Sequence, residues 1–227
     1  MIPKKIHYCW FGRNPKPKLA EKCIASWKKY CSDYEIIEWN EDNFNVFQNP
    51  YTTYLYDQQK YAFLSDYARL KIIYENGGIY LDTDVEAIRS FDDLIENSAY
   101  FGFETAAFVN TGLGFGAEMQ HPIIYELLAE YDEFLDGKHG YKGCPELNTR
   151  ALINNGLIAN GETQILDGIT VYSAEFFNPY DDPTGRLYIT ENTYSIHWYA
   201  KTWMSKKKRI RSVLTKPYHR LLDLIRH

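Results

Sequence analysis

The stretch from residue 58 to residue 84 constrains the fold of this chain more than any other part of the sequence. Its first half has large apolar residues at helical steps of three and four, namely Phe63, Tyr67, Leu70 and Tyr74. Gly77-Gly78 then supplies a helix stop, and "IYLDTD" follows at once with the pattern of a buried strand. A helix that leads straight into a strand is typical of layered α/β domains. The segment therefore predicts an α/β fold.

Helical and strand patterns alternate along the rest of the chain. Strands are predicted at residues 5–11, 34–39, 99–103, 112–116, 164–173 and 194–199, and helices at 16–31, 122–135 and 145–153. No internal repeat, low-complexity tract or linker interrupts this alternation before about residue 204. We therefore predict one domain over residues 1–204, followed by a separate segment over residues 205–227.

Composition narrows the class of protein. An apolar fraction of 45% over 227 residues is enough for a well-buried core and excludes a disordered chain. No apolar run reaches the ~18 residues of a membrane span, and "MIPKKIHYCWFG" lacks the apolar core of a signal peptide. The four cysteines form no Cys-x-x-Cys pair and are interpreted as reduced thiols. We expect a cytoplasmic protein.

Two carboxylates, Asp82 and Asp84, stand at the end of the predicted strand. Residues i and i+2 of a strand point the same way, so the two side chains would share a face if the strand continued. At a separation of about 6 Å they would repel by roughly 3 kcal/mol at an effective dielectric near 20. A hard cation such as Mg²⁺ or Mn²⁺ would compensate that repulsion and leave positions open for phosphate oxygens. A solvated turn after the strand is the simpler alternative.

The helix before this strand carries charged residues on an apolar background. Asp66 and Arg69 lie three residues apart and therefore on one face of the helix. One interpretation is a surface ion pair worth about a few tenths of a kcal/mol. The apolar neighbours Tyr67 and Leu70 instead favour a largely buried helix, in which charged groups need partners. The hydroxyl groups of a sugar would satisfy both charged residues.

These segments carry a family resemblance. The run "FLSDYARLKIIYENGGIYLDTDVE" resembles the signature of glycosyltransferase family 32, the DXD-containing sugar transferases of capsule, lipopolysaccharide and mannan synthesis. "IPKKIHYCWFG" is similar to the first strand of that family, and "SIHWYAKTW" to its closing motif. The three motifs occur in the family's order and span residues 2–203. A more remote similarity is to the catalytic domain of large glucosylating bacterial toxins.

The resemblance implies a GT-A fold, in which a Rossmann-like mixed sheet is flanked by helices. It also implies a nucleotide-sugar donor, with a UDP-hexose as our expectation, and Mn²⁺ or Mg²⁺ as cofactor. The expected acceptor is a saccharide or lipid-linked saccharide in surface polysaccharide synthesis. Retention of the anomeric configuration is implied as well. Because no protein nucleophile stands out, we expect the acceptor to attack on the face from which the diphosphate departs.

The resemblance assigns roles to individual residues. Those expected at the donor are His7, Tyr8, Trp10, Tyr80, Lys201 and Trp203. Asp66 and Arg69 are expected to hold the sugar hydroxyls, and Asp82 to contact the ribose and the metal sphere. Asp84 is expected to ligate the metal directly, with His197 facing the metal or the diphosphate. Asn110 and His121-Pro122 are weaker matches to a downstream stretch of the family. "GCPELNTRAL" (143–152) lies where the family often has a Gly-x-Pro segment near the acceptor, here with Cys144 in the middle, and Glu146 and Asn148 are its candidate site residues.

The C-terminal segment differs sharply in charge from the rest of the chain. Residues 201–227 contain nine Lys or Arg against one Asp, a net of +8, and the whole chain carries −5, which leaves −13 for the remainder. Apolar residues recur at helical spacing between the positive charges, and Pro217 is predicted to divide the segment into two short helices. Either these helices pack on the domain, or they lie on an anionic membrane surface at the inner face of the plasma membrane. Nucleic acid is not expected as a partner, because the acidic body would repel it.

Three other classes of function were considered. "IYLDTDV" also fits the strand and Asp-x-Asp pattern of haloacid-dehalogenase-like phosphatases, in which Asp82 would be the phosphorylated nucleophile. That motif normally opens its domain, whereas here about 80 residues precede it. A glycoside hydrolase needs carboxylates on both sides of a sugar, which neighbours on one strand do not provide. A carbohydrate-binding module would explain the aromatic residues but not the acidic pair.

Overall fold

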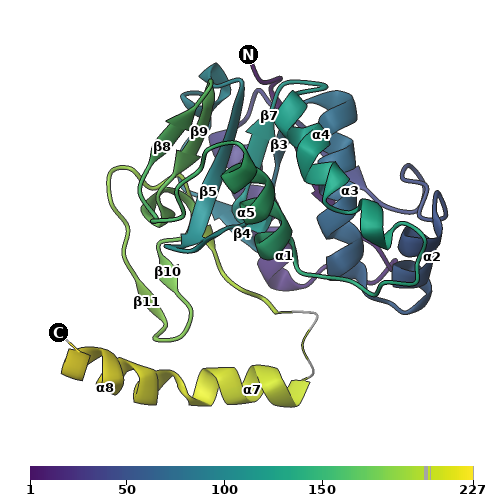
Figure 1. Ribbon diagram of the computed structural model, residues 1–227. Helices are drawn as coiled ribbons and strands as arrows, with labels where there is room; N and C mark the ends of the chain where they lie inside the picture. Colours follow the sequence, from purple (N-terminus) through teal and green to yellow (C-terminus); the bar gives the residue numbers. More distant parts are fainter. Residues whose placement is uncertain (202–203, 205, 227) are drawn as a thin grey trace.

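The computed structural model describes residues 1–201, 204 and 206–226, and Figure 1 shows its helices and strands. The strands are β1 Lys5–Cys9, β2 Glu35–Trp39, β3 Gly78–Tyr80, β4 Val85–Ala87, β5 Ala99–Thr105, β6 Phe108–Val109, β7 Phe115–Ala117, β8 Gln164–Leu166, β9 Ile169–Tyr172, β10 Tyr180–Asp181, β11 Arg186–Leu187 and β12 Ser195–His197. The helices are α1 Lys18–Tyr30, α2 Pro50–Asp57, α3 Tyr61–Asn76, α4 Pro122–Ala129, α5 Cys144–Asn154, α6 Ala174–Phe177, α7 Lys206–Leu214 and α8 Lys216–Arg226. Short 3-10 turns lie at Leu94–Glu96, Thr111–Leu113 and Asp132–Phe134.

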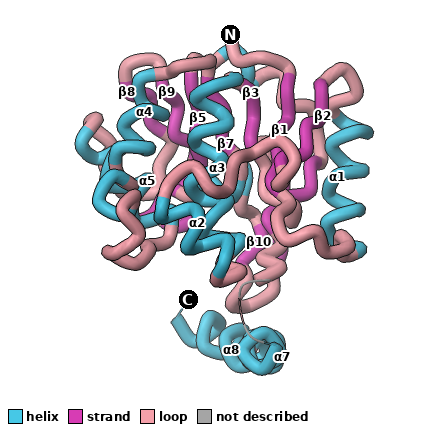
Figure 2. The backbone as a smooth tube through the Cα atoms, turned by 90° about the vertical axis from the view of Figure 1, so that its right-hand side faces the viewer, coloured by secondary structure: helices cyan, strands magenta, loops and turns pink. Residues whose placement is uncertain are grey.

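The main sheet is mixed. Its strands run in the order β2-β1-β3-β7-β5-β9-β8, with β6 paired to β5. β1 is parallel to both β2 and β3, and β5 is parallel to β9. β7 is antiparallel to its neighbours β3 and β5. Figure 2 shows these strands side by side, with α2, α3 and α5 in front of them. The α/β class predicted from the sequence is confirmed.

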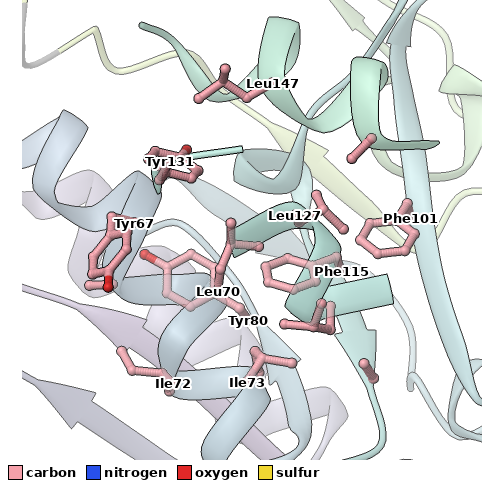
Figure 3. Close-up of a cluster of buried hydrophobic side chains, with 14 of the residues drawn as sticks. Tyr67, Leu70, Ile72, Ile73, Tyr80, Phe101, Phe115, Leu127, Tyr131 and Leu147 are labelled. Atoms are coloured by element: carbon pink, nitrogen blue, oxygen red, sulfur yellow. The ribbon is translucent and has the colours of Figure 1, made fainter. Parts of the chain in front are cut away.

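Both faces of the sheet are buried, as the alternation of side chains along its strands requires. In β3, Ile79 packs into the cluster formed with α1 and β4, and Tyr80 packs into the cluster formed with α2, α3, α4 and α5. β5 repeats the pattern with Tyr100 and Phe101. Figure 3 shows part of the second cluster, including Leu70, Ile73, Tyr80, Phe101, Phe115 and Leu127. The sheet is therefore the rigid centre that positions the residues at its edge.

The corner between α3 and β3 depends on two glycines. Gly77 has a φ of 63° and its N–H donates to the carbonyl of Ile73, which ends the helix. Gly78 has a φ of 105°, and a Cβ there would lie 2.9 Å from both His7 Nε2 and the carbonyl oxygen of Lys5. Only glycine allows β3 to pair so closely with β1. The predicted helix stop is thus also the point that places β3 in the sheet.

The acidic stretch after β3 departs from the sequence prediction. The strand expected to continue to Asp84 ends at Tyr80, and the N–H of Val85 donates to the carbonyl of Asp82 over 3.0 Å. That hydrogen bond closes a turn, so the alternation of a strand does not apply. The prediction that Asp82 and Asp84 share a strand face is therefore wrong, and the two carboxylates have different partners.

Other differences concern helix boundaries. The helix predicted over 58–76 begins at Tyr61, and the one predicted over 122–135 ends at Ala129 before a 3-10 turn. Helix α2 was not predicted, although Asn49 caps it by accepting from the N–H of Thr52 and Pro50 occupies its first turn. None of the helices in the described part of the chain is both long and apolar enough to cross a membrane.

The C-terminal helices lie below the hairpin of β10 and β11 (Figure 1). They form two short helices as predicted, with Pro217 in the first turn of α8. Lys216 Nζ lies 2.5 Å from the hydroxyl of Tyr180, and Arg220 Nε donates to the carbonyl of Thr184. The division at residues 204 and 205 remains a prediction, since Ser205 is outside the described residues.

Candidate active site

The carboxyl ends of β1, β2 and β3 meet at one edge of the sheet because these strands are parallel. Trp10 follows β1, Asn40 follows β2, and Asp82 comes two residues after β3. Parallel strands in open α/β sheets bind ligands beyond their carboxyl ends. This edge is therefore the candidate active site, and the turn from Asp82 to Val85 lies on it.

Arg69 of α3 holds two carboxylates at this edge. Its Nη2 lies 2.9 Å from Asp66 Oδ1 and 3.1 Å from Asp82 Oδ1. The guanidinium also lies over the ring of Tyr80, whose hydroxyl donates to Asp82 Oδ1 over 3.1 Å. The Arg69 side chain is 3% exposed and that of Asp82 is 27% exposed. The buried Arg69 guanidinium and the Tyr80 hydroxyl thus hold the Asp82 carboxylate in a position that is partly exposed to solvent.

Burial controls the protonation of these carboxylates. It raises the pKa of Asp82 to about 6, against the opposing charge of Arg69, and the neighbouring Asp84 adds to the increase. Burial also raises the pKa of Asp66, although Arg69 again opposes it. Arg69 stays charged throughout, because both carboxylates raise its pKa further. One cation therefore compensates two acids incompletely, which favours a ligand that brings hydroxyl donors.

Residues from distant segments close the network from the other side. The hydroxyl of Thr111 lies 3.4 Å from Arg69 Nη1 and accepts from Asn148 Nδ2 over 2.9 Å. The backbone N–H of Cys144 is directed at Asp66 Oδ2 over 3.4 Å. Asn148 is fully buried, and its Oδ1 has no hydrogen-bond partner. The candidate residue Asn148 thus lies in the site, whereas the sequence singled out neither Thr111 nor the Cys144 backbone as part of it.

Gly112 fixes how closely the segment after β6 approaches Asp82. A Cβ at this position would lie 2.7 Å from Asp82 Oδ2 and 3.2 Å from Arg69 Nη1. Asn110 Oδ1 accepts from the N–H of Gly112 over 2.7 Å and so holds the turn in place. Asn110, one of the predicted family matches, therefore positions the glycine that approaches Asp82. Gly112 itself was not singled out from the sequence.

Asp84 faces a second group of residues, on and after β12. Its Oδ1 lies 3.4 Å from His197 Nε2, and its Oδ2 accepts from the backbone N–H of Ala200 over 2.7 Å. The ring of Tyr199 lies 4.1 Å from that of His197, and its hydroxyl donates to Glu104 Oε1 over 3.1 Å. β12 pairs with β4 directly after the acidic turn, which brings "SIHWYA" to Asp84. The sequence indicated His197 but not Tyr199 or Glu104.

The charges of Asp84 and His197 support each other. Burial acts to raise the pKa of Asp84, but His197 and the hydrogen bond from Ala200 outweigh it, and the pKa is lowered. Burial acts to lower the pKa of His197, but Asp84 outweighs it, and the pKa is raised. Asp82 contributes to the raised pKa of His197, so the two groups of residues lie within electrostatic reach of each other.

The chemistry of these residues fits a divalent cation in part. The Asp84 carboxylate is a suitable ligand for Mn²⁺ or Mg²⁺, whereas imidazole suits Mn²⁺ better than the harder Mg²⁺. His197 turns Nε2 toward Asp84 and leaves its other ring nitrogen, Nδ1, buried without a hydrogen-bond partner among the described residues. Within residues 1–201, 204 and 206–226, no three His, Cys, Asp or Glu side chains are gathered closely enough to hold a metal ion alone. A metal at Asp84 would therefore need oxygen ligands from elsewhere, as phosphates supply.

Trp10 and Tyr8 form a separate group at the same edge. Lys16 Nζ lies 5.7 Å from the centre of the Trp10 ring system and 2.7 Å from Glu38 Oε2, and the hydroxyl of Tyr8 also donates to Glu38. Trp10 is half-buried and its Nε1 donates to the carbonyl of Asn14. The predicted base contact of Trp10 is compatible with this placement. Sequence reasoning missed Lys16 and Glu38.

His7 does not fit its predicted place at the donor. It is fully buried, its Nε2 lies 3.0 Å from the carbonyl oxygen of Gly77, and its Nδ1 accepts from Trp39 Nε1. Burial lowers its pKa to about 4, so the ring is neutral near pH 7. With both nitrogens engaged inside the sheet, His7 fastens β1 to the end of α3 and has no free atom for a ligand.

The remaining predicted residues lie outside these groups. Lys201 contacts Asp182 and the hydroxyl of Ser212, and its role on the donor phosphates stays a prediction. Trp203 is outside the described residues. Glu146 is exposed and pairs with Lys142, and His121 caps α4 by accepting from a backbone N–H.

The comparisons with known proteins agree with this geometry. Residues 17–101 match the family described as "Glycosyltransferase sugar-binding region containing DXD motif". The matched range includes Asp66, Arg69, Asp82 and Asp84. Over 144 residues the chain is 25% identical to inositol phosphoceramide mannosyltransferase 1 of Schizosaccharomyces pombe, covering 59% of this chain and 44% of that protein. Over 88 residues it is 35% identical to alpha-1,4-N-acetylglucosaminyltransferase of Homo sapiens, covering 39% of this chain and 24% of that protein.

The fold comparison gives the architecture. The solved structure titled PaToxG glycosyltransferase superimposes with a TM-score of 0.51 at 21% identity, over 67% of this chain and 69% of that one. The predicted GT-A fold and the resemblance to DXD-motif glycosyltransferases are confirmed. The chain spans less than half the length of the curated relatives described above. The phosphatase alternative for Asp82 gains no support, because the acidic pair falls within the glycosyltransferase region.

Proposed function

We propose that this chain, which has the sugar-binding region of the DXD-motif glycosyltransferases, transfers a hexose from a nucleotide sugar to a saccharide or lipid-linked saccharide acceptor. The proposed donor is a UDP-hexose, and the proposed process is the synthesis of a surface polysaccharide. The reaction is proposed to retain the anomeric configuration and to use Mn²⁺ or Mg²⁺.

The observation that supports this proposal best is the Arg69 network. A buried guanidinium shared by Asp66 and Asp82 leaves carboxylate oxygens that can accept from neighbouring sugar hydroxyls. Because Arg69 is fixed by Ser65, Thr111 and Tyr80, these acceptors are held in place before a ligand arrives. Such a site orients a sugar, which is what transfer from an activated donor needs.

Asp84 and His197 are the residues proposed to hold the cation. When bound, the cation would stabilise the negative charge that develops on the leaving diphosphate. The backbone N–H of Ala200 donates to the Asp84 carboxylate and so fixes the orientation of that carboxylate. The acceptor hydroxyl is proposed to attack the anomeric carbon without a protein nucleophile, as the bond to the diphosphate breaks and the departing diphosphate takes the hydroxyl proton. Asp82 supports this, because its Oδ1 already accepts from Arg69 and Tyr80.

The C-terminal segment is proposed to hold the enzyme at the inner face of the plasma membrane, on the cytoplasmic side. Tyr218 and Leu221 are 61% and 57% exposed, so these apolar side chains of α8 are not covered by the domain. The net charge of +8 over residues 201–227 would attract anionic lipid, at about 1 kcal/mol per basic residue near the surface. Deleting residues 205–227 should abolish pelleting with anionic vesicles and leave donor hydrolysis unchanged. Unchanged pelleting would remove the membrane proposal.

A panel of nucleotide sugars tests the enzymatic proposal. Incubation of the purified chain with each donor and Mn²⁺ should give slow hydrolysis of one UDP-hexose, which chelation of the metal stops. Asp84→Asn should reduce this hydrolysis roughly 100-fold or more. Asp33→Asn is the matched control, because Asp33 is an exposed partner of Lys4 away from the site. Hydrolysis of no sugar nucleotide in the panel, or full activity of Asp84→Asn, would contradict the proposal.

A further inference from the structure

An open groove of about 520 Å³ runs between α7 and the segment 198–201. Its apolar lining includes Trp198, Ile210, Val213 and Leu214. The three side chains from α7, Ile210, Val213 and Leu214, are 52%, 63% and 73% exposed, so no core side chain among the described residues fills the groove. A surface of this kind is typical of a binding site for an apolar group.

The attachment of α7 is polar, which is unusual for an amphipathic helix. A helix normally packs its apolar face on the domain and turns its polar face to water. Here Ser212 of α7 contacts Lys201 over 2.7 Å, and Lys216, at the start of α8, contacts Tyr180. The polar groups hold the helix in place, and the apolar side chains remain available to a ligand.

The groove shares a wall with the candidate active site. The N–H of Ala200 donates to Asp84, and the Tyr199 ring lies 4.1 Å from His197, while both residues also line the groove. Tyr199 and Lys201 have φ values of 50° and 51°, in the left-handed region that side chains other than glycine rarely adopt. Such conformations persist only where surrounding contacts impose them, and they cluster at functional sites.

The polar end of the groove is positive. Lys201 and Lys216 both contact Asp182, so two ammonium groups face one carboxylate. The excess positive charge can pair with an anionic group of a ligand. A ligand that combines an apolar chain with a phosphate matches both ends of the groove.

We propose that this groove binds the lipid phosphate of a lipid-linked saccharide acceptor. The lipid tail lies along Ile210, Val213 and Leu214, and the phosphate pairs with Lys216 and Lys201. This role replaces the one predicted for Lys201 on the donor phosphates. The saccharide then extends past Tyr199 and Ala200 to Asp84 and His197. This inference rests on the proposed function and makes it more specific, because it selects a lipid-linked acceptor and names the residues that recognise it.

Decyl phosphate, kept below its micelle-forming concentration, is the probe for this site. Calorimetric titration of the full chain should show saturable binding that Val213→Asp weakens at least tenfold. Leu221→Asp is the matched control, since Leu221 is also an exposed apolar residue of the C-terminal helices but does not line the groove. Lys216→Gln should weaken binding of decyl phosphate and leave binding of decanol unchanged.

The outcomes separate this inference from the proposed function. If Val213→Asp and Leu221→Asp weaken the binding of decyl phosphate equally, the C-terminal helices have a general affinity for lipid, and the groove is not the binding site. Undetectable binding of decyl phosphate would overturn it as well. In the unmodified chain, decyl phosphate should inhibit transfer to a lipid-linked acceptor without slowing donor hydrolysis. If the chain hydrolyses no sugar nucleotide, the proposed function is contradicted. The titration with decyl phosphate measures binding to the groove and does not depend on that result.

Discussion

The two carboxylates of the acidic turn lie two residues apart but in opposite settings. Asp82 faces α3, where it shares one buried cation with Asp66 and its pKa rises to about 6. Asp84 faces β12, where His197 and a backbone N–H favour its charged form and its pKa falls. The pair is therefore no symmetric metal clamp. The α3 side suits hydroxyl donors, and the β12 side suits a cation.

The largest effect should come from removing the positive charge of Arg69 on the α3 side. Arg69→Met leaves the buried Asp66 carboxylate and the partly exposed Asp82 carboxylate without their partner, which should lower the free energy of unfolding by about 3–5 kcal/mol. Urea denaturation measures the change. Lys71→Met, on the same helix, removes only the exposed pair with Glu75 and should cost less than about 0.5 kcal/mol. Similar losses for the two variants would break the contrast between the buried network and an ordinary surface pair.

A smaller effect is expected where the chain packs against Asp82. Gly112→Ala places a Cβ 2.7 Å from Asp82 Oδ2, so the carboxylate has to move. We expect a loss of about 1–3 kcal/mol in stability, with slower donor hydrolysis. In Gly143→Ala the new Cβ meets nothing nearer than Pro145 at 3.7 Å, and both properties should stay at the parent values. An active Gly112→Ala variant of parent stability would mean that Asp82 is not held as described.

The pH dependence of stability should have opposite signs for the two carboxylates. In the metal-free chain the pKa of Asp82 is about 6 when the chain is folded and near the ordinary aspartate value of 3.8 when it is unfolded. The unfolded chain binds fewer protons between these values, so the contribution of Asp82 to stability falls as pH rises through this window. Asp84, with its lowered pKa, contributes stability that is present above 3.8 and is lost at more acid pH.

Chemical denaturation of Asp82→Asn and Asp84→Asn across pH 3–7, with a chelator present, separates these contributions. The advantage of the parent over Asp82→Asn should shrink from pH 4 to pH 6, whereas its advantage over Asp84→Asn should grow from pH 3 upward. Other carboxylates titrate in the same range, but their contributions cancel in the difference between parent and variant. Difference curves with the same slope would show that the two settings are equivalent.

The sequence predicted the α3 side of the site better than the β12 side. The spacing of Asp66 and Arg69 on an apolar helix already required a buried partner, and the strand after Gly77-Gly78 supplied Asp82. The alternation of a strand failed for Asp84, because the hydrogen bond from Val85 to Asp82 turns the chain first. The position of a turn within an acidic stretch depends on the pairing of β4 with β12, which local pattern does not contain.

Long-range contacts account for the other residues that the sequence misjudged. Thr111 and Gly112 reach the site only because β7 lies next to β3, and β5 next to β7, in the sheet order. His7 has a residue type suited to ligand binding, yet both faces of its strand are covered, so its ring serves the sheet. Local periodicity predicts which residues are buried together along one element. It does not predict which elements are neighbours.

The central claim is that the β12 side of the turn holds a cation together with the diphosphate of a donor. Calorimetric titration of UDP into the chain, with and without Mn²⁺, tests it directly for the parent and for Asp84→Asn. We expect UDP to bind the parent at least tenfold more tightly with Mn²⁺, and Asp84→Asn to bind equally in both conditions. Binding of UDP that ignores Mn²⁺ in the parent, or a metal effect that survives in Asp84→Asn, would contradict the claim.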